Sequence, residues 1–176
     1  MNLYVTRHGQ TQYNIENRVC GISDVELTDT GRKQASAVAK KLKGKQIDVI
    51  IVSPLKRAQE TAAIINQVVG TQVIVDPRLQ EINFGKYEGF KNKNRGFKKT
   101  KKNHGFHYPG GESYFQVIHR VYQLLDEIKQ TYPHQNVLLV CHGGIVRTIY
   151  TYFHDISNHD LYHYLPENCC LDYYQL

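Results

Sequence analysis

Short apolar segments alternate with longer amphipathic segments along the chain, and this alternation restricts the fold more than any other feature. Runs typical of buried strands occupy residues 3–6, 47–52, 71–76 and 136–141. Helical periodicity marks residues 27–42, 54–69 and 111–132, a further helix is expected from about Gly144, and an edge strand is expected near 170–175. Buried strands that alternate with helices form parallel sheets covered on both faces. The pattern therefore predicts an α/β fold, a three-layer αβα sandwich with a mostly parallel sheet and one antiparallel edge strand.

Two residues with capping side chains precede expected helices. Thr28 is predicted to cap the helix at 27–42, because its side-chain oxygen can accept a hydrogen bond from a free N–H group of the first turn. Ser53 and Pro54 form a cap and first-turn pair for the helix at 54–69. These residues therefore predict where the two helices begin.

The chain has 176 residues, of which 41% are hydrophobic, and this suffices for one sizeable core. We therefore expect residues 1–176 to form a single domain. The sequence contains no apolar run long enough for a membrane span and no basic leader of a secretory signal, so a cytoplasmic location is expected. The four cysteines form no CxxC pair and are expected to be reduced thiols; they are Cys20, Cys141, Cys169 and Cys170.

The segment 90–109 differs in composition from the rest of the chain. It carries seven Lys or Arg residues between positions 91 and 102 and has no clean periodicity, which predicts a mobile loop or a basic loop insertion. The formal net charge of +6 suits anionic small molecules or nucleic acid as partners. The cations of this segment are expected either to be solvated or to attract anionic substrates, and composition leaves both alternatives open.

Polar side chains directly follow three of the expected strands. They are Arg7 and His8, then Ser53 and Arg57, and finally His142 with Gly143 and Gly144. Residues just beyond the carboxyl ends of parallel strands meet in one crevice, where α/β proteins bind ligands. Arginine forks and the free N–H groups of helix starts bind phosphate, and imidazole is a competent nucleophile toward phosphorus. The sequence therefore predicts a phosphate site at this edge of the sheet.

Six short motifs, in order, resemble those of the histidine phosphatase superfamily in its phosphoglycerate mutase-like branch. They are RHGQTQYN, LTDTGRKQA, SPLKRAQETA, LQEINFGKYEG, PGGES and VCHGGIVR. Each motif alone is weak, but six in the right order cover nearly the whole chain. Tyr87 stands where the family commonly has tryptophan, which we interpret as a packing change.

The resemblance implies a role for each matching residue. His8 would be the nucleophile that becomes phosphohistidine, and Glu81 would protonate the leaving alcohol and then activate water. The phosphoryl oxygens would be held by Arg7, Arg57, His142, Asn14 and the backbone N–H of Gly143. Cys20 and Gly21 would lie on the substrate side of the pocket, whereas Arg147 is interpreted as structural. No metal or other cofactor is implied, because arginine and histidine supply the charge stabilisation.

Three functions stay open at this point. The first is a metal-independent phosphatase for small phosphomonoesters, favoured because the connection between the FGKYEG and PGGES motifs is shorter than in true mutases of the family. The second is a phosphoglycerate mutase that uses the same residues, and the third is a non-catalytic module that binds anions or nucleic acid. The intact set of His8, Arg57, Glu81 and His142 argues against the third. The expected partner is a small phosphorylated substrate, with no membrane, nucleic acid disfavoured and a homodimer left open.

Overall fold

The computed structural model describes residues 1–176 and contains one five-stranded sheet in the order β3-β2-β4-β1-β5. Its strands are β1 (Asn2–Arg7), β2 (Val49–Val52), β3 (Gln72–Val75), β4 (Asn136–Cys141) and β5 (Leu171–Gln175). All neighbouring strands are parallel except β1 and β5, which pair antiparallel. The mostly parallel sheet with one antiparallel edge strand is thus confirmed.

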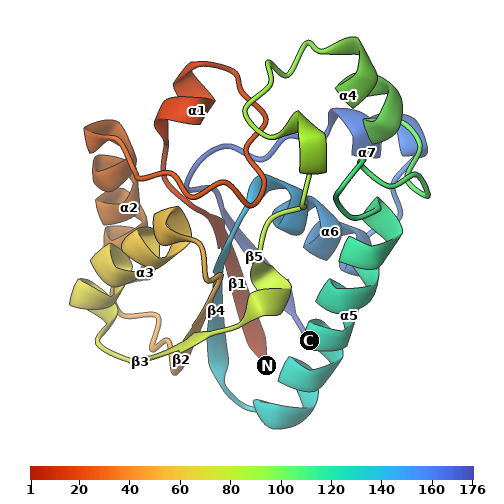
Figure 1. The fold of residues 1–176 in the computed structure, drawn as a ribbon. Coiled ribbons are helices and arrows are strands. Elements are labelled where there is room, and N and C mark those ends of the chain that lie inside the picture. The colour runs from red at the N-terminus through yellow and green to blue at the C-terminus, as the bar shows by residue number, and fades with distance from the viewer.

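Helices cover both faces of the sheet, which gives the expected three layers (Figure 1). On one face lie α2 (Asp29–Leu42) and α3 (Lys56–Val69), and on the other lie α5 (Tyr114–Thr131) and α6 (Gly143–Phe153). Side chains of a strand alternate between faces, so β4 serves two cores. Val137 and Leu139 pack with α5 and α6, whereas Leu138 and Val140 pack with α2 and α3.

The helix starts confirm one predicted cap and correct another. Thr28 caps α2, because its side chain accepts a hydrogen bond from the N–H of Gly31. The prediction for Ser53 is wrong: α3 begins at Lys56, and its N-cap is Leu55, which makes no side-chain capping bond. The Ser53 hydroxyl instead lies 2.6 Å from Nε2 of the buried His142 ring. Ser53 therefore contacts the site and does not cap the helix.

Residues 90–109, predicted to be a mobile loop or an insertion, contain one helix that the sequence did not indicate. Residues Arg95–Lys101 form α4, whose start is capped by the side chain of Asn94. Phe97 and Tyr108 are buried in the core and stack on each other with ring centroids 5.8 Å apart. Two aromatic anchors eleven residues apart, rather than a periodic apolar face, therefore hold this segment in place.

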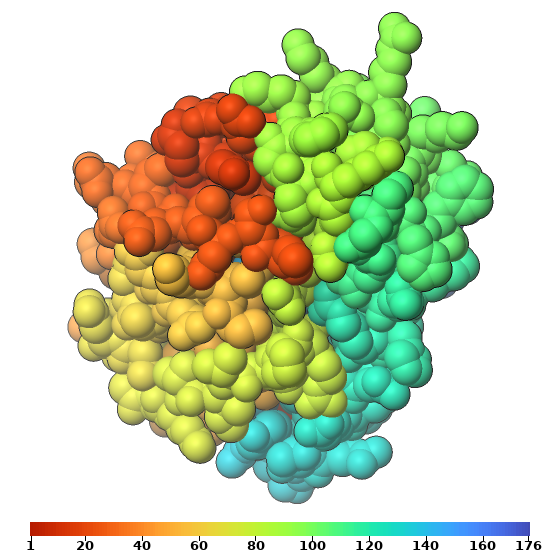
Figure 2. Space-filling view, viewed as in Figure 1, coloured from red at the N-terminus to blue at the C-terminus, as the bar shows by residue number.

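Three short helices lie beyond the carboxyl ends of the parallel strands: α1 (Gln12–Ile15), α4 and α7 (Asn158–His163) (Figure 1). The sequence predicted none of them. The segment after β1 and the segment that precedes α4 meet side by side across the upper part of the molecule (Figure 2). An isolated bridge joins Arg18 to Lys91, and Lys91 Nζ donates to the carbonyl of Glu16 at 2.9 Å. No helix of the structure combines the length and apolar character needed to cross a membrane.

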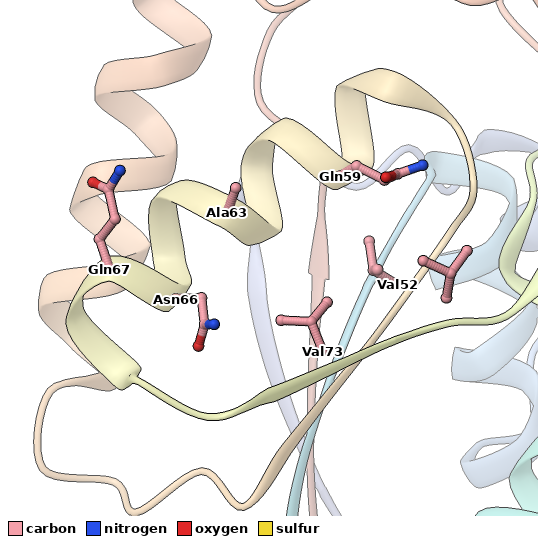
Figure 3. Close-up of a pocket in the computed structure, with 7 residues that line it drawn as sticks. Val52, Gln59, Ala63, Asn66, Gln67 and Val73 are labelled. Carbon is pink, nitrogen blue, oxygen red and sulfur yellow. The ribbon is translucent and has the colours of Figure 1, made fainter.

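A hollow of about 480 Å³ lies between α3 and β3 at the open edge of the sheet. Figure 3 shows Gln59, Ala63 and Asn66 of α3 close to Val52 and Val73 of the strands. None of the residues lining it carries a charge or a nucleophile. It is therefore a packing feature at a sheet edge without catalytic side chains.

Candidate active site

His8 follows β1 directly, and its ring is buried with 3% of its surface exposed. Its Nδ1 lies 2.7 Å from the carbonyl oxygen of Gly9. Because a carbonyl oxygen only accepts hydrogen bonds, this contact assigns the proton to Nδ1 and leaves a lone pair on Nε2. Nε2 accepts a hydrogen bond from Arg57 Nε at 3.2 Å.

The surroundings of His8 keep its ring neutral. Burial lowers the pKa of His8 well below its usual value of 6.5, and the positive charges of Arg57 and Arg7 lower it further. The hydrogen bond to Gly9 opposes this shift but is the smallest contribution. At neutral pH the imidazole is therefore unprotonated, which is the form that can attack phosphorus.

His142 follows β4 and is the N-cap residue of α6. The rings of His142 and His8 lie with centroids 5.1 Å apart. The Ser53 hydroxyl accepts from the N–H of Leu55 and can donate its proton to His142 Nε2, which leaves Nδ1 as the N–H donor. That Nδ1 is buried and has no partner in the protein. Burial, followed by the charge of Arg57, lowers the pKa of His142 well below 6.5, so this donor is neutral.

Arg57 lies in the first turn of α3 and is fully buried. Its two terminal nitrogens donate to the carbonyl oxygens of Ser23 and Gly21, each at 2.7 Å, while Nε donates to His8. The guanidinium is therefore held rigidly beside the ring of His8 by the loop after α1. Glu60, an acidic residue of the same helix, pairs with Arg32 and not with Arg57.

Glu88 holds that loop and was not singled out from the sequence. Its carboxylate accepts from the N–H groups of Gly21, Ile22, Ser23 and Phe84 at 3.1 to 3.2 Å and from the Ser23 hydroxyl at 2.6 Å. A single carboxylate thus fixes the carbonyls that orient Arg57. The available signal was its position as the last acidic residue of the FGKYEG motif.

Glu81 docks its carboxylate at the N-terminus of α6. Oε2 accepts from the N–H of Gly144 and Oε1 from the N–H of Ile82, both at 2.9 Å. The free N–H groups and the dipole of a helix start favour a negative side chain there. A Cβ atom at Gly144 would collide with Glu81 Oε1, so this glycine is required for the approach. Glu81 is 6% exposed.

A cavity of about 350 Å³ lies at this end of the sheet. The predicted site residues that line it are Arg7, Asn14, Cys20, Glu81 and Gly143. His8, Arg57 and His142 are buried and do not line the cavity, although each histidine is next in the chain to a lining residue, Arg7 or Gly143. Gly21 does not line the cavity and serves instead as an acceptor for Arg57.

Asn14 and Cys20 form part of the cavity wall. Asn14 Oδ1 accepts hydrogen bonds from the Thr11 N–H at 3.0 Å and from Asn168 Nδ2 at 3.2 Å, so its own amide N–H₂ group is left to donate. Asn168 also donates to the carbonyl of His8 at 3.0 Å, and no sequence signal identified it. Burial raises the pKa of the Cys20 thiol to about 11, so it is present as a neutral thiol.

Arg147 also lines the cavity, in contrast to its interpretation as a structural residue. It is joined there by Arg18, Lys98 and Lys101, so cations outnumber the single lining carboxylate of Glu81. A cationic cavity with a neutral buried imidazole at a helix start is the arrangement of an enzyme that transfers phosphoryl groups.

Comparisons with known proteins agree with this class. Residues 3–175 match the model of the histidine phosphatase superfamily (branch 1), and the chain belongs to this family. It is 32% identical to a protein of Bacillus subtilis named uncharacterized phosphatase PhoE over 84% of this chain and 74% of the relative. It is 38% identical to the probable phosphoglycerate mutase GpmB of Cronobacter sakazakii over 81% of this chain and 70% of that relative.

A solved structure is similar over almost the full length. The mycobacterial glucosyl-3-phosphoglycerate phosphatase superposes with a TM-score of 0.86 and 28% identity, covering 98% of this chain and 88% of that chain. The protein is thus an enzyme of the phosphatase and phosphoglycerate mutase type.

Proposed function

We propose that the protein is a metal-independent phosphatase that hydrolyses small phosphomonoesters through a phosphohistidine at His8. The observation that carries this proposal is the state of the His8 ring, whose Nδ1 proton is bound to Gly9 and whose Nε2 lone pair is flanked by Arg57. A neutral imidazole among cations is the form required to attack an anionic phosphoryl group.

In the first half-reaction, His8 Nε2 forms a bond to phosphorus while the bond from phosphorus to the ester oxygen breaks. Glu81 enters this step in its protonated form and donates the proton to the leaving oxygen, which departs as an alcohol and leaves Glu81 as a carboxylate. The charge on the phosphoryl oxygens is met by Arg7, Arg57 and the Nδ1–H group of His142. The backbone N–H of Gly143 and the amide of Asn14 complete the set of donors.

In the second half-reaction, water attacks the phosphohistidine. Glu81 takes a proton from the water as the new bond to phosphorus forms, and the bond between phosphorus and Nε2 breaks. Inorganic phosphate is released, and His8 returns to its neutral state. The cycle balances without a metal ion, because protein cations and N–H groups supply the charge stabilisation.

The mutase remains the second candidate, because a relative that is 38% identical carries that name. The phosphatase is favoured by the name of the PhoE relative and by the structural similarity to a glucosyl-3-phosphoglycerate phosphatase over 98% of this chain. A mutase returns the phosphoryl group to its product and needs a bisphosphate primer. If the enzyme releases inorganic phosphate when no bisphosphate is added, this result supports hydrolysis. The single domain and the cytoplasmic location remain predictions from the sequence.

The intermediate provides the direct test. After rapid quenching with a ³²P-labelled phosphoester, we expect acid-labile, base-stable label on the protein, as for a phosphoramidate. His8→Ala should carry no label and lose activity by about 10⁴-fold or more, in line with other enzymes that lose their nucleophile. His159→Ala, in exposed helix α7, is the matched control and should label normally.

Label that persists in His8→Ala, or label stable to acid, would exclude the proposed intermediate. EDTA treatment is expected to leave the rate unchanged, and a rate restored only by an added metal ion would contradict the metal-independent mechanism.

A further inference from the structure

Two cations of the cavity lie away from the reacting histidine and have no acidic partner. Arg147 projects from α6 and is only 9% exposed, and its buried Nε has no hydrogen-bond partner. Lys101 is half-buried at the end of α4. No carboxylate oxygen lies within 4.0 Å of either charged group. Buried cations are normally paired, so this pair requires an explanation.

Aromatic rings support both side chains without neutralising them. The Arg147 guanidinium lies 5.0 Å from the centroid of the Tyr114 ring, and Lys101 Nζ lies 4.7 Å from that of Tyr162. Contacts with ring faces orient such groups and contribute modestly to binding them. The two cations are thus held in position from two different helices, α4 and α6.

The two charges also repel each other. Burial, then the charge of Arg147 and that of Lys98, lowers the pKa of Lys101 to about 8. Burial and the same Arg147 charge lower the pKa of His104 nearby. An anion placed between Lys101 and Arg147 would relieve this repulsion and restore the full charge of Lys101.

Of the other charged lining groups, Lys98 is exposed, Arg7 is assigned to the phosphoryl group, and Glu81 and Arg18 have partners in the protein. Glu81 accepts from two backbone N–H groups at the start of α6, and Arg18 is paired with Glu16. Arg147 follows Gly143 by four residues in α6, which places it about 6 Å further along the helix axis. An anion at Arg147 would therefore lie one helix turn from the phosphoryl site, within reach of a short carbon chain.

We infer that Lys101 and Arg147 form a second anion subsite, so that this enzyme prefers phosphomonoesters carrying another anionic group on a short chain. The inference rests on the proposed function, because the phosphoryl group is taken to bind at His8. It names the shared chemistry, a carboxylate or a second phosphate, and assigns substrate selection to side chains of α4 and α6.

A matched pair of substrates tests the subsite. 3-Phosphoglycerate and glycerol 3-phosphate differ only in a carboxylate that replaces a hydroxymethyl group. We expect kcat/KM to be about tenfold or more higher for 3-phosphoglycerate, since a charge-assisted contact is worth at least that factor. Propane-1,3-diol bisphosphate, which carries a second phosphate in place of the carboxylate, is compared with glycerol 3-phosphate in the same way. The compound with the larger gain in kcat/KM shows whether the subsite prefers a carboxylate or a phosphate.

Variants then assign the preference to residues. Lys101→Met keeps the side chain over Tyr162 but removes its charge, and it should reduce the preference to within about twofold of unity, mainly through KM. Arg147→Met should act in the same direction. Lys99→Met removes the same charge from the exposed side of α4 and should keep the wild-type preference, which controls for general attraction of anions.

The outcomes separate this inference from the proposed function. Equal kcat/KM for both substrates in the wild type, or a preference unchanged in Lys101→Met and Arg147→Met, would overturn the subsite while leaving the phosphatase intact. A wild type that releases no phosphate from any ester would refute the proposed function instead. In that case calorimetric binding of the same pair still decides the subsite, which predicts about tenfold tighter binding of 3-phosphoglycerate to the wild type and no difference in Lys101→Met.

Discussion

Two hollows of this molecule differ in the chemistry of the side chains that line them. The hollow between α3 and β3 encloses about 480 Å³ and is lined by valine, alanine, glutamine and asparagine (Figure 3). The cavity at the carboxyl ends of the strands encloses about 350 Å³, and its lining includes five cationic side chains and Glu81. The larger of these two hollows is the one without charged side chains, so volume does not identify the functional site. Convergent polar groups with shifted pKa values identify the functional site.

The difference follows from where each lies in the sheet. The first hollow borders the edge strand β3, where Val73 and Val75 stay exposed because no further strand or helix covers them. The second lies where β1 and β4 end side by side in the middle of the sheet, so that chain segments from both converge. Matched changes in the two regions therefore test which one carries the activity.

The largest difference in activity between the two regions is expected when a carboxylate is replaced by an amide in one and an amide by a carboxylate in the other. Glu81→Gln should lower the rate on an alkyl phosphate by about 10²–10⁴-fold, because the amide cannot donate the proton that the leaving oxygen needs. The loss should be much smaller on p-nitrophenyl phosphate, whose leaving group needs no proton. The reverse exchange in the other hollow, Gln59→Glu, should leave both rates unchanged. Equal losses on the two substrates would show that Glu81 only shapes its loop.

Removal of one hydrogen-bonding side chain from each region should give a smaller difference in activity between the two regions. Ser53→Ala takes away the partner of His142 Nε2, and we expect kcat to fall about tenfold, since an unsatisfied buried group costs about 1–3 kcal/mol. Asn66→Ala removes two hydrogen bonds to Thr71 and should lower the melting temperature without changing kcat. Ser53→Thr should restore kcat. Normal kcat in Ser53→Ala would mean that His142 needs no support from Ser53.

The pH dependence of stability should also report the active site. Folding lowers the pKa of His8 and His142, so near pH 6 the unfolded chain binds more protons than the folded one. Stability is therefore fully present above the unfolded value of about 6.5 and falls as the pH drops below it. Melting temperatures measured from pH 7.5 to 5 should decrease, and the decrease should be shallower in His8→Ala. An identical slope in that variant would contradict the assigned neutral state.

The smallest effect is expected from filling the other hollow. Ala63 is exposed on α3, and Ala63→Leu adds apolar volume to the hollow. We expect kcat/KM within twofold of the wild type and a change in stability within about 0.5 kcal/mol, as for surface substitutions generally. Steady-state kinetics and a thermal melt measure both. A substantial loss of activity would show that the α3–β3 region contributes to function.

Periodicity predicted the sheet, its helices and the antiparallel edge because each of these elements buries a regular face. It failed at 90–109, where Phe97 and Tyr108 anchor a lysine-rich helix from outside any apolar pattern. It failed again at α1 and α7, which are too short for a periodic signal. The composition of a short segment does not show which of its side chains will be buried against distant parts of the chain.

The site was predictable where chemistry followed strand ends, and the structure brings His8, Arg57 and His142 together as expected. Residues that act through long-range hydrogen bonds were not predictable in the same way. Ser53 serves the ring of His142 rather than a helix cap, and Glu88 fixes a loop more than 60 positions earlier in the chain. Such roles depend on which groups lie buried together, and a single sequence does not specify this.

The order of strands in the sheet also sets the sequence of events in folding. β1 pairs only with β4 and β5, so Asn2 lies opposite Asn136 on one side and Gln175 on the other. Pairings this distant in the chain must close long loops, which slows folding. During synthesis, β1 therefore has no partner strand until β4 has been made. His8 follows β1 directly, so a chain that stops before β4 carries this histidine but lacks the assembled site.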